Sequence, residues 1–368
     1  RPKSGKMVIV IKKNVDVLER LNGIFSTKSI RHGLRKRKVM IIDDECDYAS
    51  MDGNNAEDSD STPKPDEITA TNKAIRRMLI HLRKSSSPTW YIGYTATPYA
   101  NVLMQENSST SGSEYGLSLF PRDFIHSLPK PNDHLDNEQY FLTPNKNVII
   151  LDDPKVKRNH TKRNFLFLHV ISREIKKIRK INNHPHISLI HTDTETVEHK
   201  RVRKEMEDEI ESIIQRTRKE VFNKIKFHLE NYYPNLLKSQ RNGVLSLIES
   251  YDDPAFDRMF SDCQIIELNR REKEKKYDGE GNLIEDDEYH LPQEIRYQKP
   301  ALSAIVVGGS RVSRGLTLKG LTNTWFTRSA KLPNYDTMLQ MARWCGYRKI
   351  NGTNYNDLVR IFITADLA

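Results

Sequence analysis

The 368-residue sequence contains few cysteines and no long apolar run. Its three cysteines, Cys46, Cys263 and Cys345, lie far apart in the chain, which argues against a disulfide scaffold and a CxxC metal site. No segment approaches the roughly 18 consecutive apolar residues of a transmembrane helix. No apolar run of the roughly 7–15 residues that form the core of a secretory signal follows the basic amino-terminal residues, so such a signal is not expected. These absences predict a cytoplasmic protein without a membrane partner.

Charge is distributed unevenly along the chain. The net charge is +10, from 59 basic and 49 acidic residues, and residues 1–38 contain 12 of the basic and 2 of the acidic ones. Lys155–Lys180 and Arg311–Arg360 are further basic segments, whereas Asp43–Glu67 is acidic. Basic segments of this kind suit a phosphate-rich partner such as nucleic acid. The alternative is that each segment is the solvated face of a helix.

Short apolar runs alternate with helical patterns near the start of the chain. Met7–Ile11, Val39–Ile42 and Trp90–Tyr94 are predicted to be buried strands. Residues 15–25 and Thr69–Lys84 have the apolar spacing of helices. This alternation predicts an α/β fold with a parallel sheet, in which ligands bind beyond the carboxyl ends of the strands.

The later part of the chain repeats this pattern with a long helical interruption. Asn164–Ile181 is predicted to be a basic amphipathic helix, and Asn334–Trp344 a second helix. Val197–Leu237 is a highly charged helical stretch that we expect to form a hairpin with residues 244–260. The strands predicted here are Ile187–His191, Gln264–Leu268, Ala304–Val307, Thr324–Phe326 and Leu358–Thr364.

An irregular segment separates the two patterns. Residues 106–160 are rich in Ser, Asn, Pro and Asp. We therefore expect two domains, residues 1–155 and 156–368, with a helical insertion at residues 197–262 in the second.

A cluster of carboxylates, Asp43-Asp44-Glu45-Cys46-Asp47, directly follows one of the predicted strands. Mg²⁺ prefers carboxylate oxygens and water as ligands. An acidic residue at the end of a strand can hold Mg²⁺ against nucleotide phosphates, and the next carboxylate can orient the attacking water. Asp44 and Glu45 are thus candidate metal ligands, and Asp44, Glu45 and Asp47 are candidate catalytic residues. The alternative is an ordinary acidic turn.

Two motifs with hydroxyl groups or glycines also follow predicted strands. Thr95-Ala96-Thr97-Pro98 comes after the strand at Trp90–Tyr94, where its hydroxyls could hydrogen-bond the acidic turn; the alternative is a helix cap with a proline turn. Residues 308–317 form a glycine-rich segment after the strand at Ala304–Val307, and the alternative is a surface loop. Its glycines allow close approach of phosphate or backbone, and its arginines supply positive charge.

A third motif, Gln340-Met341-Ala342-Arg343-Trp344-Cys345-Gly346-Tyr347-Arg348, lies near the predicted end of a helix. Arginines at such a place can reach a γ-phosphate and stabilise its charge in the transition state, which is the role of an arginine finger. The alternative is a solvated helix with a core tryptophan.

The order of these motifs resembles that of superfamily-two helicases. DECD, TATP, SRGLTL and QMARWCGYR are similar to helicase motifs two, three, five and six. Their particular forms, which include DDECDYAS, YTATPYAN and SLFPRDFIHSLP, resemble the Z-one (Z1) domain, a bacterial helicase-linked family that is also labelled an endonuclease. The resemblance spans nearly the whole chain. It implies two RecA-like lobes, the first one truncated, with parallel sheets, and ATP and Mg²⁺ as cofactors.

The resemblance also implies roles for single residues. Asp44 would assist Mg²⁺, Glu45 would position or activate water, and Asp47 would support the turn. Thr95 and Thr97 would couple hydrolysis to motion, and Arg314 would contact nucleotide or nucleic-acid backbone. Gly315 and Gln340 would contact the cofactor. Either Arg343 or Arg348 would be the arginine finger. Thr317 departs from the family pattern, because many helicases have an acidic residue there.

The sequence lacks the GxxxxGK[ST] motif with which a P-loop ATPase holds phosphates, since Ser4-Gly5-Lys6-Met7 has neither the upstream glycine nor the hydroxyl. We therefore expect a fragment of a longer protein, which by itself binds ATP poorly.

Three functions follow as hypotheses. The first is the core of a DNA-dependent ATPase, a helicase-like motor in DNA restriction, phage defence or repair, with nuclease or methyltransferase proteins as candidate partners. The second is an endonuclease whose lobes deliver DNA. Asp262 and Glu267 come nearest to a nuclease pattern, but Asn269 stands in the place of its lysine. The third is a DNA-binding module without catalytic activity.

Overall fold

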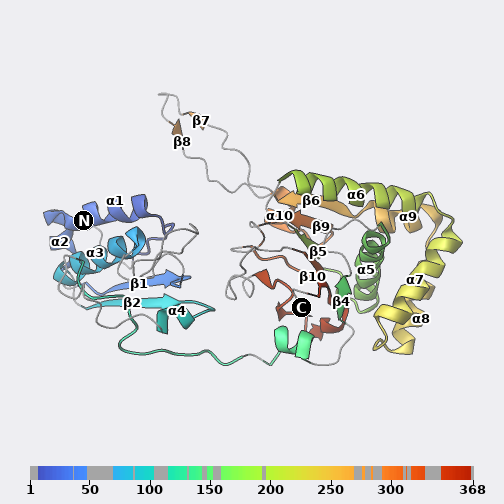
Figure 1. Cartoon of the computed structure of the whole chain (residues 1–368), viewed down its shortest axis with the longest axis horizontal. Helices are drawn as coiled ribbons and strands as arrows, with labels where there is room; N and C mark the ends of the chain where they lie inside the picture. The colour runs from blue at the N-terminus through green and yellow to red at the C-terminus, as the bar shows by residue number, and fades with distance from the viewer. Residues whose placement is uncertain are drawn as a thin grey trace. The chain divides into compact units, whose positions relative to one another are not determined.

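The computed structural model forms two compact units, Arg1–Leu128 and Pro129–Ala368, which are described separately (Figure 1). The structure describes residues 7–35, 37–47, 69–85, 88–102, 115–130, 132–142, 147–151, 159–192, 196–268, 276–277, 283–284, 292–309, 312, 316–327 and 341–365. The sequence predicted a boundary near residue 155. The division lies earlier because strands from residues 134–151 pair with strands near the end of the chain.

The first unit contains a two-stranded parallel sheet. Strand β1 (Val39–Asp44) pairs with β2 (Thr89–Tyr94) in a register that runs from Val39 opposite Thr89 to Asp44 opposite Tyr94. Both strands agree with the sequence prediction. Helix α3 (Ala70–Ser85) lies between them in the chain, and the short α4 (Tyr99–Val102) follows β2.

Helices cover one face of this sheet. Helix α1 (Val15–Ser26) begins at Asn14, whose side chain accepts a hydrogen bond from the Asp16 amide, and the shorter α2 (Lys28–Leu34) follows it. The core between helices and sheet is apolar and comprises Leu18, Ala74, Ile75, Met78, Leu79 and Leu82, packed against Val39, Ile41 and Tyr91. The alternate side chains of the strands, among them Met40, Ile42, Trp90 and Tyr94, are exposed.

Residues 7–11 differ from the prediction of a buried strand. The segment has no regular secondary structure, and Met7, Val8 and Val10 are more than three-quarters exposed. An apolar run becomes a strand only where a neighbouring strand completes its hydrogen bonds, and among the described residues β1 and β2 pair only with each other.

The second unit is built on a six-stranded sheet in which all neighbouring strands are parallel, in the order β4-β14-β10-β5-β9-β6. Its strands are β4 (Val148–Leu151), β5 (His186–His191), β6 (Gln264–Leu268), β9 (Ser303–Gly308), β10 (Leu321–Phe326) and β14 (Arg360–Thr364). Its four central strands are buried along their whole length, as expected of a parallel sheet that is covered on both faces.

Alternate strand residues face two different cores. One core joins Ile190, Ile305, Val307, Trp325 and Phe362 to the long α5 (Asn159–Ile178) and the helices that follow β5. On the opposite face, Leu189 and Val306 pack with Ile295 of α10 (Gln293–Tyr297), and Phe326 and Ile361 pack with Met341 and Trp344. The sheet is therefore the middle layer of three.

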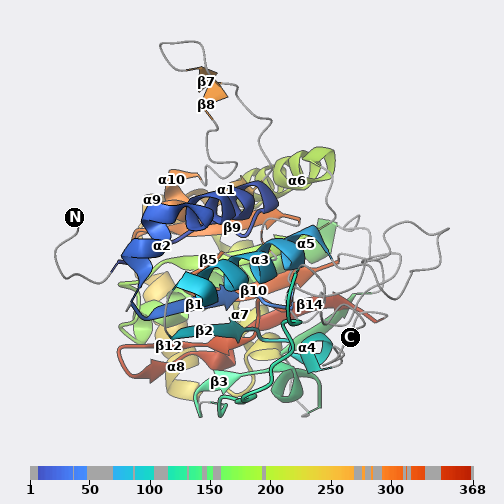
Figure 2. The same cartoon turned by 90° about the vertical axis from the view of Figure 1, so that its left-hand side faces the viewer.

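In chain order, four helices come between β5 and β6, and all four are labelled in Figure 2. They are α6 (Thr196–Ile214), α7 (Arg218–Tyr232), α8 (Lys238–Glu249) and α9 (Asp253–Ser261). The sequence predicted one helical stretch from Val197 to Leu237, but the helix is interrupted before Thr217. The side chain of Thr217 accepts from the Glu220 amide while Glu220 accepts from the Thr217 amide, and this capping box starts a new helix.

Short elements complete the second unit. These are β3 (His134–Leu135) with β11 (Gly346–Tyr347), β12 (Lys349–Ile350) with β13 (Thr353–Asn354), β7 (Lys276–Tyr277) with β8 (Leu283–Ile284), the π-helix Glu138–Leu142 and the 3-10 helix Asn356–Leu358. Asn351 and Gly352, which join β12 to β13, both have positive φ as in a type I′ hairpin. No helix in the described ranges is long and apolar enough to cross a membrane.

Candidate functional site

The acidic turn, residues Asp43–Asp47, lies at the carboxyl end of β1. It is held against the neighbouring strand, because the Cys46 amide donates to the Tyr94 carbonyl at 3.0 Å. Glu45 has a φ of 51°, in the left-handed region that non-glycine residues rarely occupy, and its amide donates to Asp44 Oδ1 at 3.1 Å. The turn is therefore tight, and it directs successive carboxylates in different directions.

Asp43 has structural partners. Its Oδ1 accepts from Lys13 Nζ at 2.9 Å, and its Oδ2 accepts from the Tyr91 hydroxyl at 2.6 Å. Lys13 also donates to the carbonyls of Asp44 and Glu45, at 3.0 and 2.7 Å. Burial, and the adjacent Asp43 carboxylate, raise the pKa of Tyr91 far above its usual range. Lys13 thus anchors the backbone of the turn and balances the one carboxylate in it that is buried.

The TATP motif contacts the turn, as the sequence predicted. The Thr97 hydroxyl donates to Asp47 Oδ2 at 2.6 Å, and the Thr97 amide donates to Thr95 Oγ1 at 2.9 Å. Thr97 is buried. The ends of β1 and β2 are therefore joined by a side-chain hydrogen bond in addition to the strand ladder.

Cys46 fills the space beneath the turn. A Cβ added to Gly93 would lie 2.7 Å from Cys46 Sγ, so this position of β2 has room only for glycine. Burial, assisted by Asp43 and Asp47, raises the pKa of the Cys46 thiol to about 11. The thiol is protonated at neutral pH, which makes Cys46 a packing residue and a poor nucleophile.

Asp44 and Glu45 remain available for chemistry. The Asp44 side chain is exposed and accepts only the adjacent amide, while the half-buried Glu45 carboxylate has no hydrogen bond or ion pair with a described residue. No group of three or more His, Cys, Asp or Glu side chains within the described ranges could hold a metal ion. Two carboxylates nevertheless fit Mg²⁺, which commonly takes one or two of them and fills its other positions with water and phosphate oxygens.

In the second unit, Arg348 is bound to its own turn. The residue is 7% exposed, and its guanidinium donates to the carbonyls of Arg343, Trp344 and Tyr347 at 2.9, 3.1 and 3.0 Å. These contacts hold residues 343–348 in shape. In this structure Arg348 therefore has the contacts of a structural residue, and the finger role stays a prediction for both arginines.

Arg343 connects two of the predicted motifs. Its Nε donates to the Val312 carbonyl at 2.7 Å, and Val312 follows the glycines that end β9. The neighbouring Trp344 is buried, with its indole N–H donating to Asn137 at 2.8 Å. Met341 is helical, whereas Arg343 and Trp344 lie in a turn. The predicted site residues Arg314, Gly315 and Gln340 lie outside the described residues.

The basic helix α5 uses its cations inside the protein. Lys162 pairs with Glu205 at 2.7 Å, and Arg163 pairs with Glu209 at 2.9 Å. Arg179, directly after the last residue of α5, pairs with Asp357 at 2.5 Å. Neither expectation for this segment, a phosphate-binding surface or a solvated face, describes these three cations, because they tie α5 to α6 and to the segment before β14.

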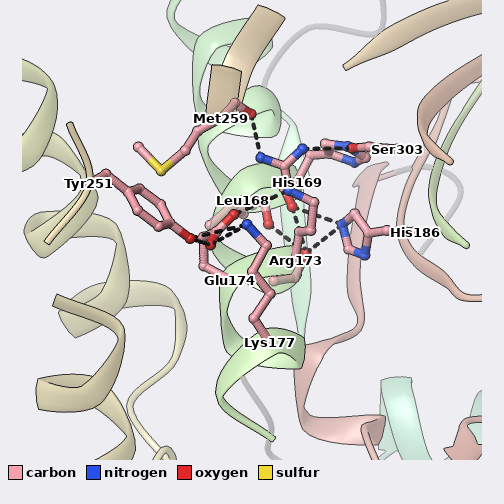
Figure 3. A network of polar contacts seen from close by, with 10 residues as sticks. Leu168, His169, Arg173, Glu174, Lys177, His186, Tyr251, Met259 and Ser303 are labelled. Carbon is pink, nitrogen blue, oxygen red and sulfur yellow. Dashed lines mark hydrogen bonds and ion pairs between the residues drawn. The ribbon is translucent and has the colours of Figure 1, made fainter. Parts of the chain in front are cut away.

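The middle of α5 carries a buried polar network (Figure 3). Arg173 donates to Ser303 Oγ and to the Met259 carbonyl, at 3.1 and 2.7 Å. The fully buried Glu174 pairs with Arg173 and Lys177 and accepts from the Tyr251 hydroxyl at 2.7 Å. A buried charge is costly unless it is paired and hydrogen-bonded, and Glu174 is both.

Two histidines in this network are neutral. His169 lies 2.8 and 3.0 Å from the hydroxyls of Ser188 and Ser303, and His186 Nε2 lies 2.8 Å from the His169 carbonyl. Burial, together with nearby Arg173 and Lys176, lowers the pKa of both imidazoles well below its ordinary value. Both ring nitrogens of His169 and Nε2 of His186 have partners within the core, whereas Nδ1 of His186 is buried without a hydrogen-bond partner among the described residues. These contacts assign both residues a structural role.

The nuclease-like residues have structural contacts as well. Glu267 lies on β6 and pairs with Arg203 at 3.6 Å, while Asp262 is the C-cap residue that follows α9. Asn269 lies outside the described residues. No observation on these residues favours a nuclease site.

The family of the chain follows from its second unit. The Z1 domain family matches residues 163–368, which is more than half of the chain. The chain belongs to the Z1 domain family. The matched region begins inside α5 and contains five of the six strands of the large sheet, while β4 and the acidic turn precede it. No curated protein and no solved structure matches the chain.

Proposed function

We propose that this Z1 domain protein is the core of a DNA-dependent ATPase with helicase-like motifs. The Z1 domain family is usually associated with defence or restriction systems, which fits such a motor. The observation that carries the proposal is the 2.6 Å hydrogen bond from Thr97 to Asp47, with two available carboxylates next to it. A merely acidic turn would not require a buried threonine from the next strand.

The chemistry proposed for the turn divides among its residues. Asp44, which is exposed, would hold Mg²⁺ through water or directly, and Glu45 would accept a hydrogen bond from the attacking water and orient it. When bound, Mg²⁺ would neutralise charge on the phosphates. Asp47 and Thr97 would keep the turn in register with β2. A displacement of the carboxyl end of β2 would then also displace the acidic turn after β1.

The second unit would supply contacts to nucleotide or nucleic acid. Arg343 ties the segment at residues 341–348 to the loop after β9, so the two motifs are in direct contact. Arg314, Gly315 and Gln340 belong to the same two motifs and are proposed as cofactor contacts on that basis. Nucleic acid would be bound through its backbone and without sequence readout.

The test measures ATP hydrolysis by the protein as its gene encodes it, with and without DNA. We expect Glu45→Gln to reduce DNA-stimulated hydrolysis at least 100-fold. Glu230→Gln on α7 makes the same chemical change at an exposed residue and should leave the rate unchanged. Full activity of the Glu45→Gln protein would reject the proposed role of the acidic turn.

A further inference from the structure

The first unit has a cationic edge that none of the motifs accounts for. The sequence has no Asp or Glu between Arg20 and Ile42, and α3 has none either. Seven exposed cations belong to the described part of these stretches. Arg37 has an interaction of its own, and the other six are Lys28, Arg31, Arg35, Lys38, Arg83 and Lys84. We call these six residues the amino-edge cluster.

The topology brings the two stretches that carry these six residues to the same edge of the sheet. Helix α2 leads into β1, and α3 leads into β2. The first residues of the two strands, Val39 and Thr89, are paired, and the Val39 amide donates to the Pro88 carbonyl at 3.0 Å. The ends of both helices therefore reach the amino edge of the sheet, at which the arrows of β1 and β2 begin (Figure 1).

The electrostatics of His81 agree with this placement of the two helices. His81 lies on α3, one turn before its end. Burial is the largest cause that lowers its pKa, followed by Arg31 of α2 and by Lys84 and Arg77 of α3, while Glu19 of α1 acts in the opposite direction. An imidazole is affected in this way only when the cations of both helices lie near it.

The chain does not neutralise this cluster as it neutralises the cations of α5. Lys162, Arg163 and Arg179 each have a carboxylate within 3 Å. The side chains of the amino-edge cluster form no ion pair or hydrogen bond with a described residue. Helix ends do attract cations, but favourable dipole interactions do not explain six mutually repelling charges from two helices and a connecting segment.

We propose that the amino-edge cluster binds the phosphate backbone of double-stranded nucleic acid. The six long, exposed side chains form no buried pocket for a single small anion, and they can contact several successive phosphates of a nucleic-acid backbone. A membrane is a weaker fit, because α2 has only seven residues and one exposed large apolar side chain, Ile30. The proposal shares with the proposed function the assumption that the protein handles nucleic acid, but it does not depend on ATP hydrolysis.

The cluster is separate from the acidic turn. The turn lies at the carboxyl edge of the same sheet, and the five steps of ~3.3 Å between the six residues of β1 place about 17 Å between the two edges. The unit is therefore polarised, with carboxylates at one edge and cations at the other. A backbone held at the amino edge stays clear of the repulsion from Asp44 and Glu45.

The test compares two triple variants of the protein as its gene encodes it. Lys28→Gln, Lys38→Gln and Lys84→Gln remove three charges from the cluster. Lys200→Gln, Lys219→Gln and Lys226→Gln remove three charges from exposed positions of α6 and α7 and serve as the matched control. Binding to a fluorescein-labelled 30-base-pair DNA of mixed sequence is measured by anisotropy without nucleotide, at several salt concentrations.

We expect the cluster variant to bind at least tenfold more weakly than the control at physiological salt. Each lost phosphate contact reduces the slope of log K against log salt by about 0.9, so the slope should fall by about 2.7. The corresponding Lys→Arg triple variant should keep wild-type affinity, and thermal unfolding should show that all three variants are folded.

Equal affinities and equal salt slopes for the cluster and control variants would overturn the proposal. The same holds if the cluster variant keeps its DNA affinity but loses binding to phosphatidylserine vesicles or to a polyglutamate peptide, since the partner would then be a membrane or an acidic protein. ATP hydrolysis without DNA is measured in parallel. If the cluster variant loses DNA affinity while its basal ATP hydrolysis is unchanged, the result supports DNA binding by the amino-edge cluster. The activity of the Glu45→Gln protein tests only the proposed role of the acidic turn.

Discussion

The hydroxyl of Thr97 lies 2.6 Å from Oδ2 of Asp47 and joins two turns that are 50 residues apart in the chain. Thr97 is buried, and the carboxylate that it contacts belongs to the acidic turn that follows β1. The bond therefore couples the position of the acidic turn to the end of β2. Its removal is the most direct way to separate the structural from the proposed catalytic contribution of this region.

Thr97→Val removes the hydroxyl and keeps the shape of the side chain. We expect the free energy of unfolding of the first unit to fall by about 1–2 kcal/mol, because a hydrogen bond to a charged acceptor is lost. Thr97→Ser keeps the hydroxyl and should retain most of the stability and the DNA-stimulated hydrolysis. Urea unfolding followed by circular dichroism measures the first quantity. A Thr97→Val protein as stable as the wild type would show that the bond contributes nothing.

Gly93→Ala tests the packing beneath the turn. The added Cβ would lie 2.7 Å from Cys46 Sγ, so we expect a loss of about 1–3 kcal/mol in stability from overpacking. Gly23→Ala is the matched control, since its Cβ meets nothing within 4 Å; in helix α1 it should stabilise by about 0.5–1 kcal/mol. Combining Gly93→Ala with Cys46→Ala should restore part of the loss. Independent, additive effects of these two substitutions would contradict the proposed clash.

Arg348→Met tests whether this arginine holds the turn at residues 343–348. Its guanidinium donates to several backbone carbonyls, so we expect the free energy of unfolding of the second unit to fall by about 2–4 kcal/mol. Arg348→Lys has fewer donors and should lie between. Arg216→Met, at an exposed position after α6, is the control and should change stability by less than about 0.5 kcal/mol. If Arg348→Met were as stable as the wild type, Arg348 would not be needed to hold the turn, and the arginine-finger role would be the better explanation for it.

The buried histidines predict that the second unit is less stable in mild acid. Burial lowers the pKa of His228 from 6.5 to about 4, and it lowers the pKa values of His169 and His186 well below 6.5. Between pH 6.5 and 4 the unfolded chain binds protons at these rings and the folded chain does not, so stability falls as the pH is lowered through this range. It is fully present above pH 6.5.

Urea unfolding at pH 7.5, 6.5, 5.5 and 4.5 measures this dependence. His228→Gln should reduce the slope between pH 6.5 and 4.5, whereas His32→Gln, which alters an exposed ring of α2, should leave it unchanged. The same slope in all three proteins would show that other groups cause the dependence.

Local patterns predicted the strands well and the roles of charged residues poorly. The apolar runs at Val39–Ile42, Ile187–His191 and Ala304–Val307 became strands because each is short, apolar and followed by a turn signal. Met7–Ile11 has the same composition but no partner strand among the described residues, and strand formation depends on a partner. The cations of α5 also could not be assigned from sequence, since their carboxylates lie about 40 to 180 residues away.

The candidate site shows the same division. The acidic cluster, the TATP motif and their order were visible in the sequence, and so was a contact between them, because parallel strands end at the same edge of a sheet. Lys13 and Tyr91 were missed. A lysine after an apolar run carries no signal of its own, and Tyr91 faces Asp43 only in the parallel register of β1 with β2.

The sequence by itself determined the α/β class, most strand positions and the acidic and hydroxyl motifs, because these depend on interactions between residues close together in the chain. It also contained the resemblance to the Z1 domain. Only the tertiary structure decided which charges are used internally and which remain exposed. Charge pairing depends on distance in space, so Arg348 and the cations of α5 are bound within the protein, while the amino-edge cluster of the first unit has no internal partner among the described residues.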